Sequence, residues 1–132
     1  GWFAAKMDDC LSWIPARVSW LLLSGTAGLL PGFSGVNALK VGWKDCSKLS
    51  SPNAGWCEAT AAGALNIKLC GPIWRDGKLS QEFWIGNSSE REGATSVDIY
   101  RMNKLVLGST LLGILLFVFF LYFSRFVTLI GT

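Results

Sequence analysis

Residues 105–123 read LVLGSTLLGILLFVFFLYF, a run without a charged side chain that decides the fold class. Wound as an α-helix, this run would be about 28 Å long, close to the hydrocarbon thickness of a bilayer. Lys104 and Arg125 flank it. The pattern predicts a transmembrane helix over 105–123, followed by a C-terminal tail over 124–132.

A second apolar stretch lies over residues 14–33, after a mixed pre-membrane segment over 1–13. Arg17 lies near its start, and Gly25, Gly28 and Pro31 lower its helix propensity. We expect a second transmembrane helix here. The sequence therefore predicts a mainly α fragment of a polytopic integral membrane protein, in which two transmembrane helices flank a long, partly helical, functional polar loop over 34–104.

The chain begins with Gly1 rather than methionine, and neither apolar run has the features of a cleaved signal peptide. We therefore expect a fragment of a longer protein. Basic residues are more frequent at the loop ends of the two spans than at their far ends, which predicts a cytoplasmic loop in a protein of the cell (inner) membrane. The two sets are Lys40, Lys44, Lys48, Arg91, Arg101 and Lys104, against Lys6, Arg17 and Arg125.

Composition excludes several kinds of chemistry. The net charge is only +3 without a basic run, so we expect no nucleic-acid partner. The chain has no histidine, so histidine-ligated zinc or haem and Ser-His-Asp or Cys-His catalysis cannot be built from it alone. Its four cysteines form no C-x-x-C pair, and we interpret them as buried thiols in a reducing compartment. A Cys57–Cys70 disulfide is the alternative in an oxidising one.

Within the loop, Ser51 followed by Pro52 predicts a capped helix over 52–65. Gly55, Ala59 and Gly63 recur every four residues, so one face of this helix has almost no side-chain bulk. Close packing of another helix and close approach of a ligand both fit that face.

Short sequence patterns predict further structure in the rest of the loop. Asp76-Gly77 predicts a turn. The aromatic segment over 83–87 ends at another turn signal, and its composition also fits an anchor at the membrane interface. A helix is expected to start near Ser96, with Asp98 in its first turn, and to continue into the final span.

Charged residues gather around the Ser51-Pro52-Asn53 turn, with Lys44, Asp45 and Lys48 before it and Glu58 after it. A helix start with free N–H groups is a natural anion site, and lysines add positive charge for phosphate. Asp45 and Glu58 are our candidate magnesium ligands. The pattern indicates a phosphate site, although each residue alone also fits a solvated surface.

Arg17 is a cation near the end of a predicted membrane helix, which is costly unless it snorkels or pairs. We consider two arrangements for it. Either it snorkels to the interface, or it pairs with Asp8, Asp9 or an anionic substrate at the membrane surface.

Two segments of the chain, in order, resemble one known family, the adenosylcobinamide-phosphate synthases of cobalamin biosynthesis. Residues 8–17, DDCLSWIPAR, are similar to the family's D-D-x-x-N-x-I-P-A-R segment. Residues 51–58, SPNAGWCE, with AGAL at 62–65 and Gly71-Pro72, are similar to its S-P-N-A-G-x-x-E…A-G-A-L…G-G-P segment. The resemblance extends over nearly the whole chain, which would be the C-terminal portion of such a protein.

The resemblance implies an ATP-dependent enzyme that joins adenosylcobyric acid to aminopropanol phosphate through an amide bond. It implies ATP and Mg²⁺ as cofactors, the corrinoid and the aminopropanol phosphate as substrates, lipids as surroundings, and other cobalamin-biosynthesis enzymes as partners. The site residues it implies fall into two groups. The catalytic ones are Asn53, Glu58 and Asp45, and those that bind substrate or phosphate are Arg17, Lys48, Ser51, Gly55, Asp8 and Asp9.

This chain departs from the family pattern near the site. Ser12 replaces an asparagine, Ser47 and Leu49 stand where arginine and histidine are common, Ser50 replaces a proline, and Cys70 replaces a glycine. The alternatives to an active ligase are a relative with another acyl-transfer substrate, an inactive paralogue, and a non-catalytic membrane regulator or sensor of the same superfamily.

Overall fold

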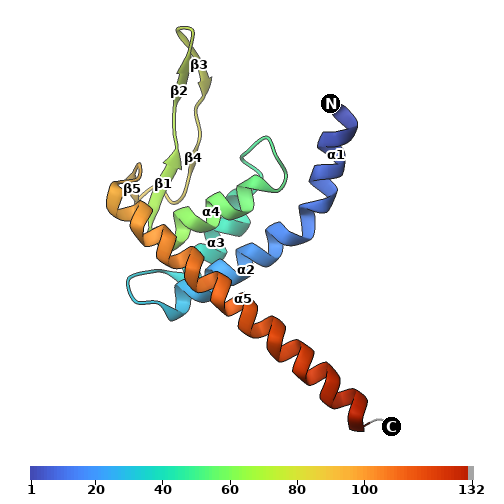
Figure 1. The fold of residues 1–132 in the computed structure, drawn as a ribbon. Coiled ribbons are helices and arrows are strands. Elements are labelled where there is room, and N and C mark those ends of the chain that lie inside the picture. Colours follow the sequence, from blue (N-terminus) through green and yellow to red (C-terminus); the bar gives the residue numbers. More distant parts are fainter. Residues whose placement is uncertain (131–132) are drawn as a thin grey trace.

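A computed structural model describes residues 1–130 as five helices and five short strands (Figure 1). The mainly helical composition agrees with the prediction from sequence. The helices are α1 (Trp2–Leu11), α2 (Trp13–Leu29), α3 (Gly35–Asp45), α4 (Ala54–Leu65) and α5 (Ser96–Ile130). The strands are β1 (Ile67–Cys70), β2 (Ile73–Arg75), β3 (Lys78–Gln81), β4 (Trp84–Ile85) and β5 (Arg91–Glu92).

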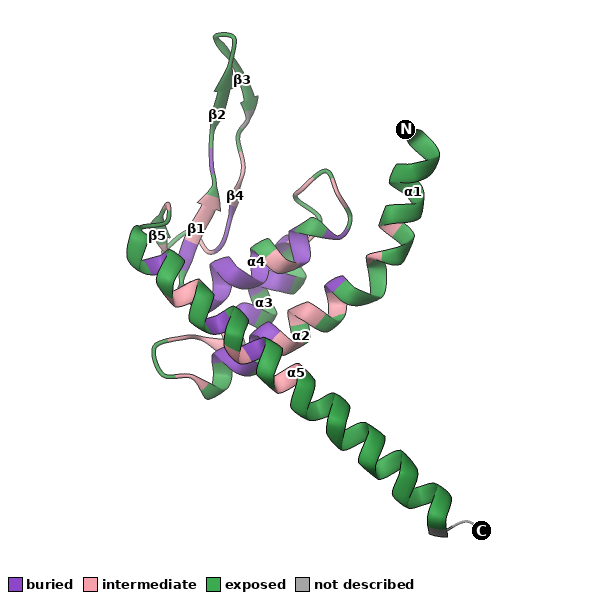
Figure 2. Ribbon diagram, in the orientation of Figure 1, coloured by how far each residue is buried: buried purple, intermediate pink, exposed green. Residues whose placement is uncertain are grey.

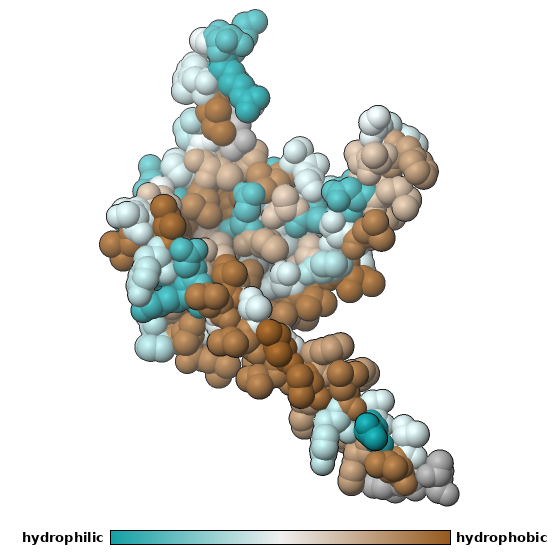
Figure 3. All heavy atoms as spheres, in the orientation of Figure 1, coloured by the Kyte–Doolittle hydropathy of each residue, from teal (hydrophilic) through white to brown (hydrophobic). Residues whose placement is uncertain are grey.

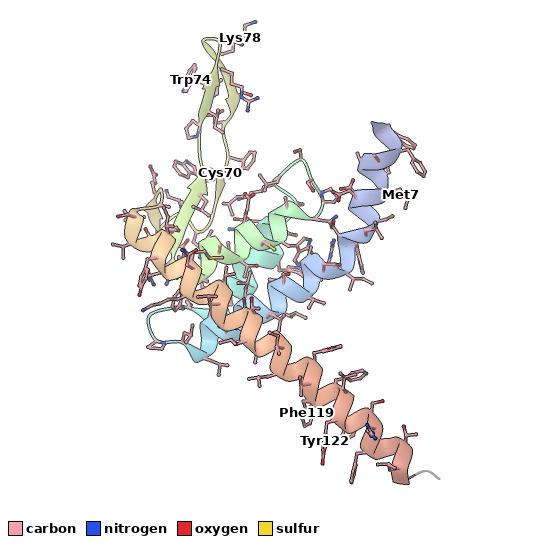
Figure 4. The ribbon with its side chains drawn as sticks, viewed as in Figure 1. Met7, Cys70, Trp74, Lys78, Phe119 and Tyr122 are labelled. Carbon is pink, nitrogen blue, oxygen red and sulfur yellow. The ribbon has the colours of Figure 1, made fainter. Side chains whose placement is uncertain are left out.

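Helix α5 is long and apolar enough to cross a membrane, and it is the one such helix among residues 1–130. It starts at Ser96 as predicted and continues to Ile130, so residues 124–130, which we assigned to a tail, extend the helix. Only 11% of its most apolar stretch is buried (Figure 2). The middle of α5 forms a hydrophobic surface that gives way to more polar atoms near its C-terminal end (Figure 3), and the side chains of Phe119 and Tyr122 extend outward from the helix (Figure 4).

The start of α5 is fixed by Asp98, which is 3% exposed. Its carboxylate accepts hydrogen bonds from the backbone N–H of Thr95 at 2.8 Å and from the Thr95 hydroxyl at 2.7 Å. Arg91 also donates to it, and Arg101 lies 3.5 Å away. An acid in this first turn therefore caps the helix and joins it to β5.

Helix α2 ends at Leu29, before the end of the span predicted over 14–33. One side of it is buried against α3, α4 and α5, as Leu23 and Ala27 show. It crosses α5 closely, because a Cβ on Gly108 would lie 2.8 Å from Cγ2 of Thr26. The structure thus supports one candidate span, and a span over 14–33 stays a prediction.

Helices α3 and α4 pack along the small-residue face that the sequence predicted. A Cβ on Gly63 would lie 2.6 Å from the carbonyl oxygen of Asn37, and Ala59 is completely buried. A Cβ on Gly55 would lie 1.9 Å from the carbonyl oxygen of Cys46. Of the two interpretations of this face, helix packing is the one observed.

The predicted start of the helix at Pro52 is two residues early, because α4 begins at Ala54 with Asn53 as its N-cap. Ser51 still contributes, since its hydroxyl lies 3.4 Å from the backbone nitrogens of Asn53 and Ala54.

The strands form two small sheets, with orders β4-β1-β5 and β2-β3. The Asp76-Gly77 turn is confirmed, with φ of 50° and 73°, and it joins β2 to β3 in a hairpin that projects away from the helices (Figure 1). Ile85 in β4 is completely buried against Val41 and Ala59. The segment over 83–87 therefore contributes Ile85 to the protein core, with Phe83 and Trp84 half-buried beside it, and its role as an anchor at the membrane interface stays a prediction.

The cysteines form no disulfide within residues 1–130. Cys10 and Cys70 are exposed, and Cys46 and Cys57 are half-buried. The expectation of four buried thiols was therefore wrong for the two exposed ones.

Candidate functional site

Arg17 lies on α2 between two indole rings. Its guanidinium carbon lies 4.6 Å from the ring centre of Trp13 and 4.8 Å from that of Trp56. Trp13 precedes it by one helical turn, so the first contact follows from helix geometry. Trp56 comes from α4. Stacking on both rings holds the guanidinium plane and leaves the N–H groups at its edge free to donate hydrogen bonds.

One of those N–H groups donates to Oδ1 of Asn53 at 2.6 Å, and Arg17 also donates to the carbonyl of Trp13 at 3.0 Å. The ion pair of Arg17 with Asp8 or Asp9 that we considered is not formed within the part of the chain described. The connection to the acidic segment is indirect. Arg17 donates to the side chain of Asn53, and Asn53 in turn donates to the backbone carbonyl of Asp9.

Asn53 is 7% exposed and joins three helices. Its Oδ1 accepts from Arg17 on α2, its Nδ2 donates to the carbonyl of Asp9 on α1 at 2.8 Å, and its backbone begins α4. Each amide atom thus faces a group of the complementary kind, which fixes the orientation of the side chain. The bond between Arg17 and Asn53 connects the two sequence segments that carry the family resemblance.

A cluster of indoles supports this junction. The ring centre of Trp20 lies 5.0 Å from that of Trp56 and 5.8 Å from that of Trp43, and Trp43 and Trp56 are 5.7 Å apart. The buried Nε1 of Trp20 has no hydrogen-bond partner among the described residues. The cluster fixes Trp56 under the guanidinium, so the position of Arg17 depends on side chains from α2, α3 and α4.

Beside Asn53 the surface forms a hollow of about 370 Å³. Three of the predicted site residues, Asp8, Ser51 and Asn53, line it. The other lining residues are Ser12, Pro15, Ala16, Ser19, Ala54 and Cys57. The N-terminus of α4, a carboxylate and three serine hydroxyls therefore surround one small space, which suits a polar, partly anionic ligand.

A second hollow of about 320 Å³ shares Ser19 and Cys57 with the first and extends to Val106 and Thr110 of α5. Burial raises the pKa of the Cys57 thiol, and the charge of Glu58 adds to this, while a hydrogen bond with Ser19 opposes it. The thiol is thus kept in its neutral form. It is better suited to line the site than to act as a nucleophile.

Asp45 and Lys48 lie at a different place. Asp45 is completely buried, and its Oδ2 accepts from the backbone N–H of Gly86 at 2.9 Å. Lys48 Nζ lies 3.0 Å from Oδ1 as an ion pair without hydrogen-bond alignment, and it donates to the carbonyl of Trp84 at 2.7 Å. This pair fastens the segment after α3 to β4, and neither residue lines the hollow beside Asn53.

Glu58 is exposed on α4, and Gly55 is buried against Cys46. The described residues contain no group of three His, Cys, Asp or Glu side chains arranged to hold a metal ion. Asp45 is enclosed by protein whereas Glu58 faces outward, so this geometry does not favour the two as joint magnesium ligands. Asp8 is the one carboxylate among the residues lining the hollow.

Of the nine residues predicted from sequence to form one site, the structure brings five together and places the other four elsewhere. The five are Asp8, Asp9, Arg17, Ser51 and Asn53, and the four are Asp45, Lys48, Gly55 and Glu58. Sequence reasoning missed the roles of Trp13 and Trp56. The i, i+4 spacing of Trp13 and Arg17 was a usable signal, whereas Trp56 reaches Arg17 only through the packing of α4 on α2.

Comparison with known proteins gives one consistent result. The family model described as CobD/CbiB protein matches residues 1–106. The chain is 44% identical to a protein of Yersinia enterocolitica named cobalamin biosynthesis protein CobD, over 89% of this chain and 36% of the relative. It is 43% identical to cobalamin biosynthesis protein CbiB of Salmonella arizonae, with the same two coverages. The chain therefore spans about a third of the length of these relatives, and no solved structure matches it.

Proposed function

The chain belongs to the CobD/CbiB protein family, and from that premise we propose that it forms part of an integral membrane adenosylcobinamide-phosphate synthase. The proposed reaction joins adenosylcobyric acid to aminopropanol phosphate through an amide bond. The names of its relatives support a place in cobalamin biosynthesis. The reaction itself rests on the resemblance and on the chemistry of the junction between Arg17 and Asn53.

That junction is the observation that carries the proposal. Arg17 and Asn53 come from the two segments of family resemblance, and a 2.6 Å hydrogen bond joins them. Arg17 places a fixed positive charge behind the amide of Asn53, next to the N-terminus of α4. Both features favour the binding of a phosphate group in the adjoining hollow.

ATP would supply the phosphoryl group that activates the corrinoid carboxylate, and the amine would then attack the activated carboxyl carbon with release of inorganic phosphate. In this chain, Ser51 and the first N–H groups of α4 would hold the phosphate of a substrate, and Asp8 would face its amine. Arg17 would be a positioning residue that orients Asn53. The work of the site would be alignment and charge neutralisation.

Within this proposal Asp45 and Lys48 hold the loop before α4 in place, since both are bonded to β4 or the residue after it. Glu58 remains a proposed contact on the exposed side of α4. The proposed topology has α5 and residues 14–33 as membrane spans, with the segment between them on the cytoplasmic side of the inner membrane, where ATP is present.

A chimera tests the function, with this chain replacing the matched segment of a full-length CobD/CbiB relative. The chimera should form adenosylcobinamide phosphate from adenosylcobyric acid, aminopropanol phosphate, ATP and Mg²⁺. Asn53→Ala should lower that rate about 100-fold, a loss typical of a polar group that stabilises a reacting anion. Asn103→Ala, an exposed asparagine on α5, is the matched control and should retain the parental rate.

A non-catalytic sensor or regulator is the second candidate, and Leu49 is the observation that favours it. Leu49 stands where histidine is common in the family, and it packs against the cluster of Val41, Ala59 and Ile85. Leu49 is half-buried and has no polar group, so it cannot supply the hydrogen bonds or the proton transfer that a histidine would. A folded, membrane-inserted chimera that binds a corrinoid but forms no amide would support this candidate and reject the ligase.

A further inference from the structure

A hollow of about 480 Å³ lies where α5 passes the connection between α2 and α3. Its lining is apolar apart from two cations, Arg101 and Lys104. The other lining residues are Leu30, Pro31, Phe33, Leu107, Gly108 and Leu111. It shares no lining residue with the hollow beside Asn53, so the proposed function does not explain it.

The two cations differ in how far they are engaged. Arg101 donates to the carbonyl of Gly32, lies 3.5 Å from the Asp98 carboxylate, and stacks 5.1 Å from the ring centre of Phe33. Lys104 is exposed, with its ammonium 4.8 Å from the ring centre of Tyr100.

Within the described chain, Lys104 forms no ion pair with a carboxylate. Asp98 already serves Arg91 as well as Arg101. The rim of the hollow therefore carries positive charge that the protein does not neutralise.

The order of residues along α5 matches the order of groups in a lipid. Leu107 and Leu111 follow Lys104 by one and two turns, and they are 66% and 62% exposed. At 1.5 Å per residue, Leu111 lies about 10 Å deeper along the helix than Lys104. A phosphate at Lys104 would thus be continuous with acyl chains over the leucines, at the point where α5 enters its long exposed apolar stretch.

We propose that this hollow binds an anionic phospholipid, with its phosphate at Lys104 and Arg101 and an acyl chain along Leu107 and Leu111. Charge complementarity selects an anionic headgroup, and the apolar lining selects a lipid over a free phosphate. This site is independent of the proposed catalytic one. It would set the depth and orientation of α5 in the membrane.

The test uses the full chain in nanodiscs of mixed phosphatidylglycerol and phosphatidylcholine, with the lipids retained on extraction counted by native mass spectrometry. The parent should retain phosphatidylglycerol over phosphatidylcholine. Lys104→Gln should reduce phosphatidylglycerol retention about fivefold, the effect of one cation at a membrane surface. Lys78→Gln, at the projecting hairpin, should leave it unchanged.

Two further experiments test whether the hollow binds a whole lipid, through its acyl chain as well as its phosphate, or only a free phosphate group. Leu111→Asn should reduce retention of phosphatidylglycerol without adding charge, and soluble glycerol phosphate should fail to displace it. Equal retention of the two lipids, no effect of Lys104→Gln, or displacement by glycerol phosphate would each overturn the proposal. The first of these is the result expected if another polypeptide segment covers this face.

Discussion

Arg17 and Asn53 are 36 positions apart, yet an N–H of the guanidinium lies 2.6 Å from the amide oxygen. The two tryptophans that stack on Arg17 come from the same two helices as the hydrogen-bonded pair. Neither residue can hold this arrangement alone, because the indoles fix the guanidinium and the carbonyl of Asp9 fixes the amide. The site is thus a product of tertiary packing between α1, α2 and α4.

The packing of α4 on α3 leads to a first prediction. Gly55→Ala should lower the free energy of unfolding by about 3 kcal/mol, the upper range for overpacking, because the new methyl group would collide with the backbone carbonyl of Cys46. Gly28→Ala is the matched control. Nothing lies within 4 Å of its added methyl group, and it should stabilise α2 by up to about 1 kcal/mol. Denaturant titration in micelles measures both, and equal effects would contradict this packing.

The capping of α5 by Asp98 leads to a second prediction. Asp98→Asn keeps the shape of the side chain but removes the charge that Arg91 and Arg101 face. We expect a loss of about 1.5 kcal/mol in the free energy of unfolding, because the charged hydrogen bonds of the helix cap are weakened while the partly exposed Arg91 and Arg101 stay solvated. Asp76→Asn changes the same atoms at an exposed turn with φ of 50°, which asparagine tolerates, and should be neutral. Denaturant titration in micelles measures both variants. Equal stability of Asp98→Asn and Asp76→Asn would show that Asp98 does not stabilise the start of α5.

The Cys57 thiol leads to a third prediction, on pH. Because burial raises its pKa, the neutral form persists to higher pH than in an exposed thiol, and less thiolate is present at any pH below that pKa. In a variant that retains only Cys57, the alkylation rate by iodoacetamide should rise with pH to a midpoint above the ordinary thiol value. A variant that retains only the exposed Cys10 provides the comparison for accessibility. A Cys57 midpoint at or below the ordinary value would be inconsistent with this environment.

Local patterns predicted the parts of the fold that depend on local forces. The uncharged run over 105–123 predicted the final helix, and the Asp76-Gly77 pair predicted a turn, because lipid solvation and backbone conformation are local properties. The end of the apolar stretch over 14–33 was less predictable. Helix α2 stops at Leu29, where the chain turns to place α3 against α4.

Long-range contacts explain what the sequence did not predict. In the sequence, Asp45 looks like a solvated or metal-binding acid, yet the folded protein buries it completely. The sequence did not indicate this, because the hydrogen-bond donor that satisfies it, the N–H of Gly86, lies 41 positions away. Strands such as β4 and β5 are two residues long and have no periodicity from which to predict them. The family resemblance predicted that Arg17 and Asn53 belong to the same site. Their direct hydrogen bond and the stacking of Trp56 on Arg17 depend on the packing of α4 against α2, which the sequence does not show.

A double-mutant cycle tests whether Arg17 acts through Asn53. The measurement is kcat/KM for adenosylcobinamide phosphate formation by the chimera and by its Arg17→Ala, Asn53→Ala and doubly substituted forms. If Arg17 acts through Asn53, the double variant should be no slower than the slower single variant, because the second substitution removes nothing that remains. Losses that multiply in the double variant, or single variants with the parental rate, would contradict the account.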